Sequence, residues 1–451
     1  MPTVLRHRTY RRLLTAQVVA LAGTGLATVA LSLLAHDLAG ADATAVLGTA
    51  LALKMTAYVG IAPVISALAH RVPRRALLVS MDLIRAAAAL TLPFVTQVGQ
   101  IYALILLLQA ASAAFTPTFQ ATLPDVLPDE RDYTRALSLS RLAHDLENVL
   151  SPALAAALLT WFTYDWLFAG TALGFLASGA LVLSVLLPGA EPAERTGGLY
   201  ARASFGTRLF LATPRLRALL ALDLVVAAGG AMVLVNTVVL VRDFLGRSAA
   251  DVPLALGAYG AGSMIVALLV PRALDRIGER SLMLPAAFVQ TAVLALLPLG
   301  LRRGGASWSW PALPAAWLIL GAATSAVLTP AGRLLRRSGR PADLPALFAA
   351  RFSLTHACWL ITYPLAGWTA ARAGLPASAT VLTAVALGGT VAAVRLWPRT
   401  DTDEREDDDA EPAPVHQPPP DGDRRHTHPA PFGSPPPPGV TPRPPSGRNG
   451  A

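Results

Sequence analysis

Several charged or metal-binding side chains lie inside long apolar stretches of this 451-residue sequence. A charged side chain at the centre of a membrane-spanning helix costs about 2.5–3.5 kcal/mol on insertion scales, so residues of this kind mark functional sites. Lys54, for example, lies near the middle of one stretch with no opposite charge within a helical turn. The candidates to line a path for a solute or for protons are Lys54, His144, Asp145, Asp223, Asn236 and His356.

Two of these candidates are carboxylates that could exchange protons. A carboxylate such as Asp145 or Asp223, once removed from water, can take up a proton and release it when its surroundings change. A cation that enters the same cavity competes with that proton, which couples the two movements without covalent chemistry. Asp223 also lies near the predicted membrane interface, where helix capping or a gate contact explains a carboxylate equally well.

Four of the side chains are of types that bind Ni²⁺, namely His144, Asp145, His356 and Cys358. Nickel favours imidazole, thiolate and carboxylate ligands. His356 and Cys358 are two positions apart, so on a regular helix they point about 200° apart and share an ion only if the helix unwinds. His144 with Asp145, facing His356 from another helix, is an easier arrangement. A hydrogen bond to a neighbouring helix explains a single membrane histidine as readily.

A second set of charged residues is suited to holding a gate closed. Asp82 and Arg85 are three positions apart, and Arg141 and Asp145 are four apart, so each pair lies on one face of a helix and can form an ion pair. Two short basic turns after apolar stretches supply further candidates. The predicted gate and loop residues are His70, Arg71, Asp82, Arg85, Arg141, Asp275 and Arg276.

Long helices must position these side chains. The chain is 53% hydrophobic and only 14% charged, whereas soluble domains carry about 25% charged residues, which excludes a large soluble enzyme. Continuous apolar runs of about 20 residues span a bilayer as helices, unlike the alternating strands of a barrel. The sequence predicts an all-α membrane protein with twelve transmembrane helices, at about 13–36, 46–69, 76–97, 101–123, 136–159, 166–187, 217–241, 254–274, 281–300, 311–332, 344–369 and 376–397.

Arginines gather in alternate connections between the apolar runs, with Arg302 and Arg303 as an exception. Basic connections stay in the cytoplasm, so we expect a multi-pass protein of the plasma membrane with both termini cytoplasmic. This pattern also explains the formal net charge of +9 without a nucleic-acid partner. The expected partners are the lipid bilayer, protons and a small solute or metal ion, and the protein is expected to be a monomer.

The chain divides into two similar halves. A basic turn with His70 and Arg71 follows the second span, and one with Asp275 and Arg276 follows the eighth, at nearly the separation that relates Pro117 to Pro330. Duplicated helix sets place a substrate site at their interface. The sequence predicts six-helix bundles at 1–187 and 217–397, a cytoplasmic linker at 188–216, and a disordered, proline-rich acidic tail at 398–451.

These features resemble the major facilitator superfamily over residues 8–397. Asp275-Arg276-Ile277-Gly278-Glu279-Arg280 is similar to the loop motif of that family, whereas its first-half copy has His70 in place of the usual aspartate. A narrower resemblance, to the nickel-resistance permeases, rests on residues 48–55, 115–122, 131–142 and 353–367. The resemblance implies two pseudo-symmetric bundles that work by alternating access, and proton-coupled efflux of Ni²⁺ or Co²⁺. The tail is poorer in histidine than tails in that group.

Two other functions remain open. Efflux of a small amphipathic organic compound, such as a macrolide, another drug or a siderophore, would use the same fold. A membrane enzyme would need converging catalytic groups, and Ser140, His144 and Asp145 on one helical turn do not imply such geometry. The sequence contains no G-x-x-x-x-G-K-[ST] nucleotide loop. We therefore expect a transporter without catalytic residues or a cofactor.

Overall fold

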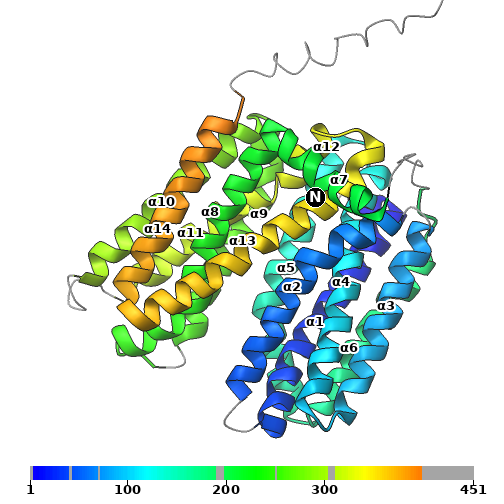
Figure 1. The fold of residues 1–451 in the computed structure, drawn as a ribbon, viewed down its shortest axis with the longest axis horizontal. Helices are drawn as coiled ribbons and strands as arrows, with labels where there is room; N and C mark the ends of the chain where they lie inside the picture. The colour runs from blue at the N-terminus through cyan, green and yellow to red at the C-terminus, as the bar shows by residue number, and fades with distance from the viewer. Residues whose placement is uncertain are drawn as a thin grey trace, which may run out of the picture. The chain divides into compact units, whose positions relative to one another are not determined.

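The computed structural model describes residues 4–39, 43–69, 72–188, 198–248, 251–302 and 310–398. Within these ranges the chain is all-helical and has no strands, which confirms the predicted fold class (Figure 1). His70, Arg71 and the predicted tail beyond Pro398 lie outside the described residues.

Each predicted span corresponds to one long helix. These helices are α1 (Arg8–Ala39), α2 (Ala43–Ala69), α3 (Arg74–Thr91), α4 (Val98–Val126), α5 (Glu130–Leu159), α6 (Asp165–Leu183), α8 (Pro214–Val239), α9 (Asp251–Leu274), α10 (Glu279–Arg302), α11 (Ala312–Leu328), α13 (Leu344–Ala373) and α14 (Leu375–Leu396). Short helical turns are η1 (Val4–Arg6), η3 (Leu92–Phe94), η4 (Leu240–Phe244) and η6 (Pro341–Asp343).

Two further helices differ from the predicted organisation. Helix α7 (Leu199–Ala212) lies within the segment predicted to be a loop. Helix α12 (Ala331–Arg337) starts after a break, because α11 ends at Leu328 and Pro330 has no amide hydrogen to continue the helical ladder. The predicted span 311–332 therefore ends about one turn early.

Ten of the described helical segments are long and apolar enough to cross a membrane by length and composition. Helix α2 contains the apolar stretch Thr49–Ile65. Helix α5 does not meet this criterion, because charged residues continue from Glu130 to Glu147. A charged helix of this kind is stable in a membrane only where its polar face is turned toward protein or water.

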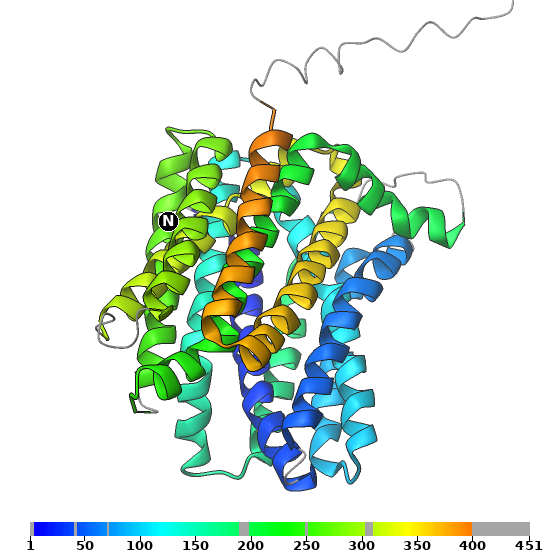
Figure 2. The same ribbon diagram turned by 60° about the vertical axis from the view of Figure 1, so that its left-hand side comes forward.

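The long helices pack in two groups, α1–α6 and α8–α11 with α13 and α14 (Figure 1). The second group has one continuous apolar core, whereas the first has three smaller clusters. Helix α13 packs on α2 and α4, and α5 packs on α9, so these contacts join the groups (Figure 2). The exact domain boundaries, at 187/188 and 216/217, stay predictions.

Helices α9 and α11 approach most closely where two glycines meet the opposite backbone. A Cβ atom at Gly262 would overlap the carbonyl oxygen of Leu318, and one at Gly321 would overlap that of Tyr259. Small residues let membrane helices approach in this way. The close fit holds α9 firmly, and α9 carries Ser263 toward α5.

Candidate functional site

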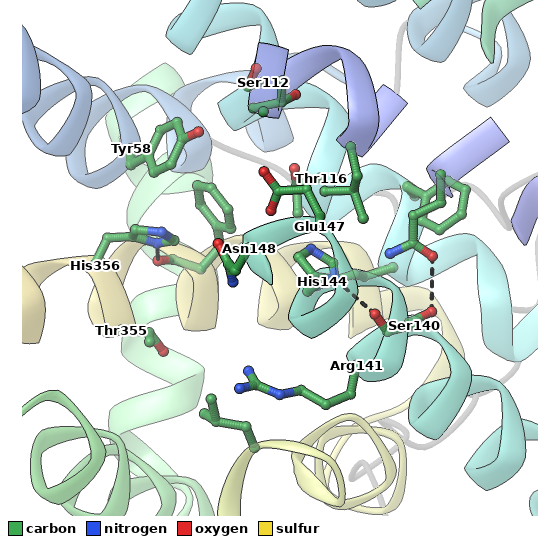
Figure 3. Close-up of a pocket in the computed structure, with 18 of the residues that line it drawn as sticks. Tyr58, Ser112, Thr116, Ser140, Arg141, His144, Glu147, Asn148, Thr355 and His356 are labelled. Carbon is green, nitrogen blue, oxygen red and sulfur yellow. Dashed lines mark hydrogen bonds between the residues drawn. The ribbon is translucent and has the colours of Figure 1, made fainter. Parts of the chain in front are cut away.

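A cavity of about 740 Å³ lies between the two helix groups, with walls formed by α1–α5 on one side and by α11–α13 on the other. Its volume is within the range of about 300–1,000 Å³ that is typical of small-molecule sites. Figure 3 shows Arg141, His144 and Glu147 of α5 on one side of the cavity and Thr355 and His356 of α13 on the other.

Helix α5 presents a polar face to the cavity because its polar residues recur every three or four positions. Ser140, Arg141, His144, Glu147 and Ser151 all line the cavity. This spacing follows one side of a helix with 3.6 residues per turn. The face explains how a helix with so many charged residues fits among apolar neighbours.

Aromatic rings form the wall where α2 meets α13. The ring of Tyr58 lies 4.9 Å from that of Phe352 and 4.6 Å from that of His356, measured between centroids. The hydroxyl of Tyr58 donates a hydrogen bond to Oε1 of Gln109 at 2.8 Å. The ammonium nitrogen of Lys54 lies 5.7 Å from the Tyr58 ring centroid, within the range of a cation–π contact.

Both cavity histidines are held in the same way. Nδ1 of His144 lies 2.8 Å from the carbonyl oxygen of Ser140, and Nδ1 of His356 lies 2.6 Å from that of Phe352. A carbonyl oxygen only accepts, so each Nδ1 carries a hydrogen. In the neutral form of either ring, Nε2 is an acceptor.

Three guanidinium groups that line the cavity are each paired with a carboxylate. Arg85 pairs with Asp82 on α3, and its guanidinium lies 4.2 Å and 4.4 Å from the ring centroids of Phe115 and Phe175. Both members of the pair are almost completely buried. This ion pair is therefore local to the first group of helices.

The second pair joins the two helix groups. Arg141 lies 2.8 Å from Oδ1 of Asp145 on its own helix, and it donates to Oγ of Ser263 on α9 at 3.0–3.1 Å. Ser263 in turn donates to Oδ2 of Asp145 at 2.6 Å. The predicted pair between Arg141 and Asp145 therefore exists, with a hydroxyl from the other half bound to both members.

The third pair connects helices that are distant in sequence. Arg351 on α13 lies 3.5 Å from Oδ1 of Asp223 on α8, and Thr355 donates to Oδ2 of the same carboxylate at 2.8 Å. Asp223 is completely buried. It lies behind the residues that face the cavity, and Arg351 and Thr355 are the cavity-lining members of this group.

Lys54 and Glu147 are the charged cavity residues without such a pair. Within the described part of the chain, no carboxylate lies within 4.0 Å of Lys54, and no basic group lies within 4.0 Å of Glu147. The two side chains interact at longer range, because the positive charge of Lys54 attracts the Glu147 carboxylate. The cavity therefore holds one unpaired cation and one unpaired anion.

The cavity includes some predicted site residues and leaves out others. Lys54, His144 and His356 line it, as do Arg85 and Arg141, which were predicted for the gate. Asp145 and Asp223 lie behind it in ion pairs. Asn236 is buried, where its amide donates to Ser378 at 3.1 Å, and Cys358 is buried; neither is among the lining residues.

The four residues predicted to bind metal do not gather at one point. Across the described ranges, no three His, Cys, Asp or Glu side chains lie close enough together to hold a metal ion. His356 and Cys358 lie on the continuous helix α13, so they keep the divergent directions expected for positions two apart.

The arginine-rich end of the molecule contains a separate network. Arg333 and Arg337 of α12 both pair with Glu130 at the start of α5 and with Glu279 at the start of α10. Nearby, Asp275 pairs with Arg131 at 3.3 Å. Arg276 is exposed, and its side chain has no partner among the described residues. The network joins both helix groups at this end.

Two charged cavity residues, Glu147 and Arg351, were absent from the predicted site. The sequence contained a signal for Glu147, because it follows His144 by three positions and precedes Ser151 by four. Arg351 stands near the start of a span, and its partner, Asp223, is 128 positions away in the sequence. The packing of α8 against α13 brings Arg351 and Asp223 together.

Comparison with known proteins extends these observations. The sequence profile described as "Major Facilitator Superfamily" matches residues 13–301 and 219–436. No curated protein sequence matches the chain at a significant level.

Solved structures share the fold at low sequence identity. The human organic anion transporter MFSD10 (TETRAN) is similar with a TM-score of 0.74 and 14% identity, over 86% of this chain and 99% of that one. A bacterial homologue of the iron transporter ferroportin, in an outward-facing state, has a TM-score of 0.72 and 14% identity, over 86% and 99%. The proton:xylose symporter XylE has a TM-score of 0.67 and 13% identity, over 88% and 96%.

Proposed function

This chain belongs to the major facilitator superfamily and is therefore a multi-pass secondary transporter, and we propose that it exports a small organic solute from the cytoplasm in exchange for protons. Export through the plasma membrane, with both termini cytoplasmic, is part of the proposal and rests on the arginine pattern. The family consists of transporters, so no chemical reaction on the solute is required.

The observation that carries this proposal is the unpaired carboxylate of Glu147 in the cavity. Ion pairs hold Asp82, Asp145 and Asp223, so protonating any of them would leave an arginine without its counter-ion. Glu147 can accept a proton without breaking an ion pair. A solute group that binds the ionised carboxylate then displaces the proton, which couples the two movements.

The arrangement of the other charges supports alternating access. The network of Arg333, Arg337, Glu130 and Glu279 fastens the helix groups together at the arginine-rich end, and the contact between Arg141 and Ser263 fastens them beside the cavity. Opening that end requires these contacts to separate. We assign gate roles to them, and we retain Asp275 and Arg276 as loop residues of the same gate.

Cavity composition favours an organic solute over a metal ion. Three of the four basic side chains that line the cavity are already paired with an aspartate, and no three His, Cys, Asp or Glu side chains of the described ranges lie close enough together to hold a metal ion. Aromatic rings of Tyr58, Phe352 and Trp359 offer apolar contact to a carbon skeleton.

Flux in proteoliposomes tests the proposal. We expect a pH gradient to drive accumulation of a solute from a panel of small organic compounds, and Glu147→Gln to reduce that flux by about 100-fold, in the range typical of a lost proton-transfer group. The control is Asp243→Asn, because Asp243 is exposed and has no side-chain partner among the described residues. Undiminished gradient-driven flux in Glu147→Gln would overturn the role of this carboxylate.

Nickel, with cobalt, is a second candidate substrate because of the two histidines. His144 and His356 line the same cavity, and each has Nδ1 bound to a backbone carbonyl, the arrangement that leaves Nε2 ready for a metal. Asp145 and Cys358, the other two ligands that the sequence suggested, do not line the cavity, so only the two histidines support this candidate. Deleting the gene and measuring Ni²⁺ and Co²⁺ tolerance decides this point. Unchanged tolerance together with accumulation of an organic solute would exclude metal export.

A further inference from the structure

The two unpaired charges of the cavity have opposite signs and come from different helices. Lys54 belongs to α2 and Glu147 to α5, and both line the same space. We propose that the solute is a zwitterion that binds with its ammonium group at Glu147 and its carboxylate at Lys54. This inference rests on the proposed export of an organic solute.

The other charged groups that border the cavity are already neutralised. Arg85, Arg141 and Arg351 each pair with their own aspartate, as described above. His144 and His356 have their Nδ1 hydrogens bound to backbone carbonyls. Among the described residues that line the cavity, a charged solute therefore meets two side chains whose charges are still uncompensated, Lys54 and Glu147.

Lys54 and Glu147 are too far apart to neutralise each other directly. Their charged atoms are separated by more than 4.0 Å, yet Lys54 still acts electrostatically on the Glu147 carboxylate. Neither charge is neutralised by direct contact with the other, so each is available to one end of a zwitterion. An amino acid or a short peptide has both groups on one skeleton.

Solutes with a single charge fit this pair less well. An amine alone would leave Lys54 uncompensated in a site that the solute has emptied of water, and a carboxylic acid alone would do the same to Glu147. An uncompensated charge in such surroundings is strongly unfavourable. A zwitterion satisfies both side chains at once, so the site discriminates by charge pattern as well as by size.

The aromatic wall defines the remaining part of the solute. Tyr58 lies between Lys54 and the rings of Phe352 and His356, and Trp359 continues the same wall along α13. An aromatic or large aliphatic side chain attached to the zwitterionic end would pack there. The structure thus favours amino acids and short peptides with an apolar side chain.

Proton exchange follows directly from this binding mode. A protonated Glu147 carboxyl group facing the cytoplasm loses its proton when the solute ammonium takes its place, and that proton enters the cytoplasm. After the solute leaves on the other side, Glu147 takes up a proton there. One proton thus moves inward for each zwitterion that moves outward.

Binding of matched probes to the purified full-length chain tests the proposal. The zwitterions are L-phenylalanine and the dipeptide phenylalanyl-alanine; 3-phenylpropionate lacks the ammonium group, and phenethylamine lacks the carboxylate. We expect at least one zwitterion to bind with a Kd about tenfold below those of both single-charge probes, measured by isothermal titration calorimetry in detergent. Equal affinity for all probes, or no binding of either zwitterion, would overturn the proposal.

Two variants test which side chain binds the ammonium group of the solute and which binds its carboxylate. Glu147→Gln should lose the preference for the zwitterion over 3-phenylpropionate, and Lys54→Gln should lose the preference over phenethylamine. If each variant keeps the wild-type preference, the two groups are not the recognition elements. Thermal unfolding of each purified variant shows whether it is folded, and Asp243→Asn is again the matched control.

A failure of the zwitterion proposal can be distinguished from a failure of proton-coupled export. If a pH gradient drives flux of phenethylamine or of an uncharged compound but of neither zwitterion, proton-coupled export stands and the zwitterion proposal fails. If a zwitterion binds but no gradient drives its movement, the recognition site stands and proton-coupled export fails.

Discussion

The cavity and the arginine-rich end both contain groups of charged side chains, but they use them differently. At the arginine-rich end, Arg333 and Arg337 each contact two glutamates, so each carboxylate is shared. In the cavity, three arginines have one aspartate each, and Lys54 and Glu147 have no ion-pair partner among the described residues. Paired charges hold helices together, whereas unpaired charges are available to a solute and a proton.

Removing a buried partner should give the largest effect on stability. Asp223→Ala leaves the partly buried Arg351 without its counter-ion and removes the acceptor of Thr355. We expect the free energy of unfolding to fall by about 3–5 kcal/mol, as for other broken buried pairs. Thermal unfolding in detergent measures the change, with Asp243→Ala as the exposed control. A loss no greater than that of the control would show that the pair does not hold α8 to α13.

Breaking the shared network should alter the accessibility of the cavity. In the double variant Arg333→Gln and Arg337→Gln, both glutamates lose their arginine contacts, so the arginine-rich end should open more often. The variant Leu328→Cys, made in a Cys358→Ala background, places a single thiol in the cavity wall. Its rate of labelling reports how often the cavity opens at this end. We expect a polar maleimide to label inside-out vesicles several-fold faster. Arg272→Gln, at an exposed arginine without a side-chain partner in the described chain, should leave the rate unchanged.

Removing the single hydroxyl that joins the two helix groups should have a smaller effect on stability. Ser263→Ala removes the contact of α9 with Arg141 and Asp145 but leaves that ion pair intact. We expect a loss of about 1 kcal/mol in unfolding free energy, together with a change in flux. Ser80→Ala is the comparison, since Ser80 bonds only to the carbonyl of Leu77 in its own helix. Equal flux in the two variants would argue against a role for the link in the transport cycle.

Replacing the unpaired lysine should have the smallest effect on stability among these variants. Lys54→Gln breaks no ion pair, so the free energy of unfolding should change by no more than about 0.5 kcal/mol. Flux should nevertheless fall clearly. A large loss of stability would mean that Lys54 has a structural partner, and the contrast between paired and unpaired charges would then not hold for this residue.

Much of the fold could be predicted from apolar patterning. Each predicted span matches a helix, because a run of about 20 apolar residues has no other stable form in lipid. Departures occur where local chemistry interrupts the pattern. Pro330 separates α11 from α12, and the connection at 188–216 contains α7. Phe210 of α7 is buried, and Gly206 of α7 packs closely against the backbone of Ala346 on α13.

The cavity was predicted only in part. Lys54, His144 and His356 were found because an ionisable group in an apolar helix is conspicuous in a sequence. Glu147 was not selected, because the stripe through Arg141 and Asp145 runs along the neighbouring face of α5. Within that stripe, Asp145 bonds to Ser263 of α9, whereas Arg141 lines the cavity together with His144 and Glu147.

The sequence by itself determined which segments enter the membrane and which charged groups they carry, since both follow from the order of residues along single helices. Only the tertiary structure decided which of those charges are neutralised. The carboxylate of Asp223 meets Arg351 because α8 packs against α13, and the pair on α5 meets Ser263 because α9 crosses it. An ion pair between distant segments depends on side-chain separations of a few ångströms, and those separations are set by helix packing.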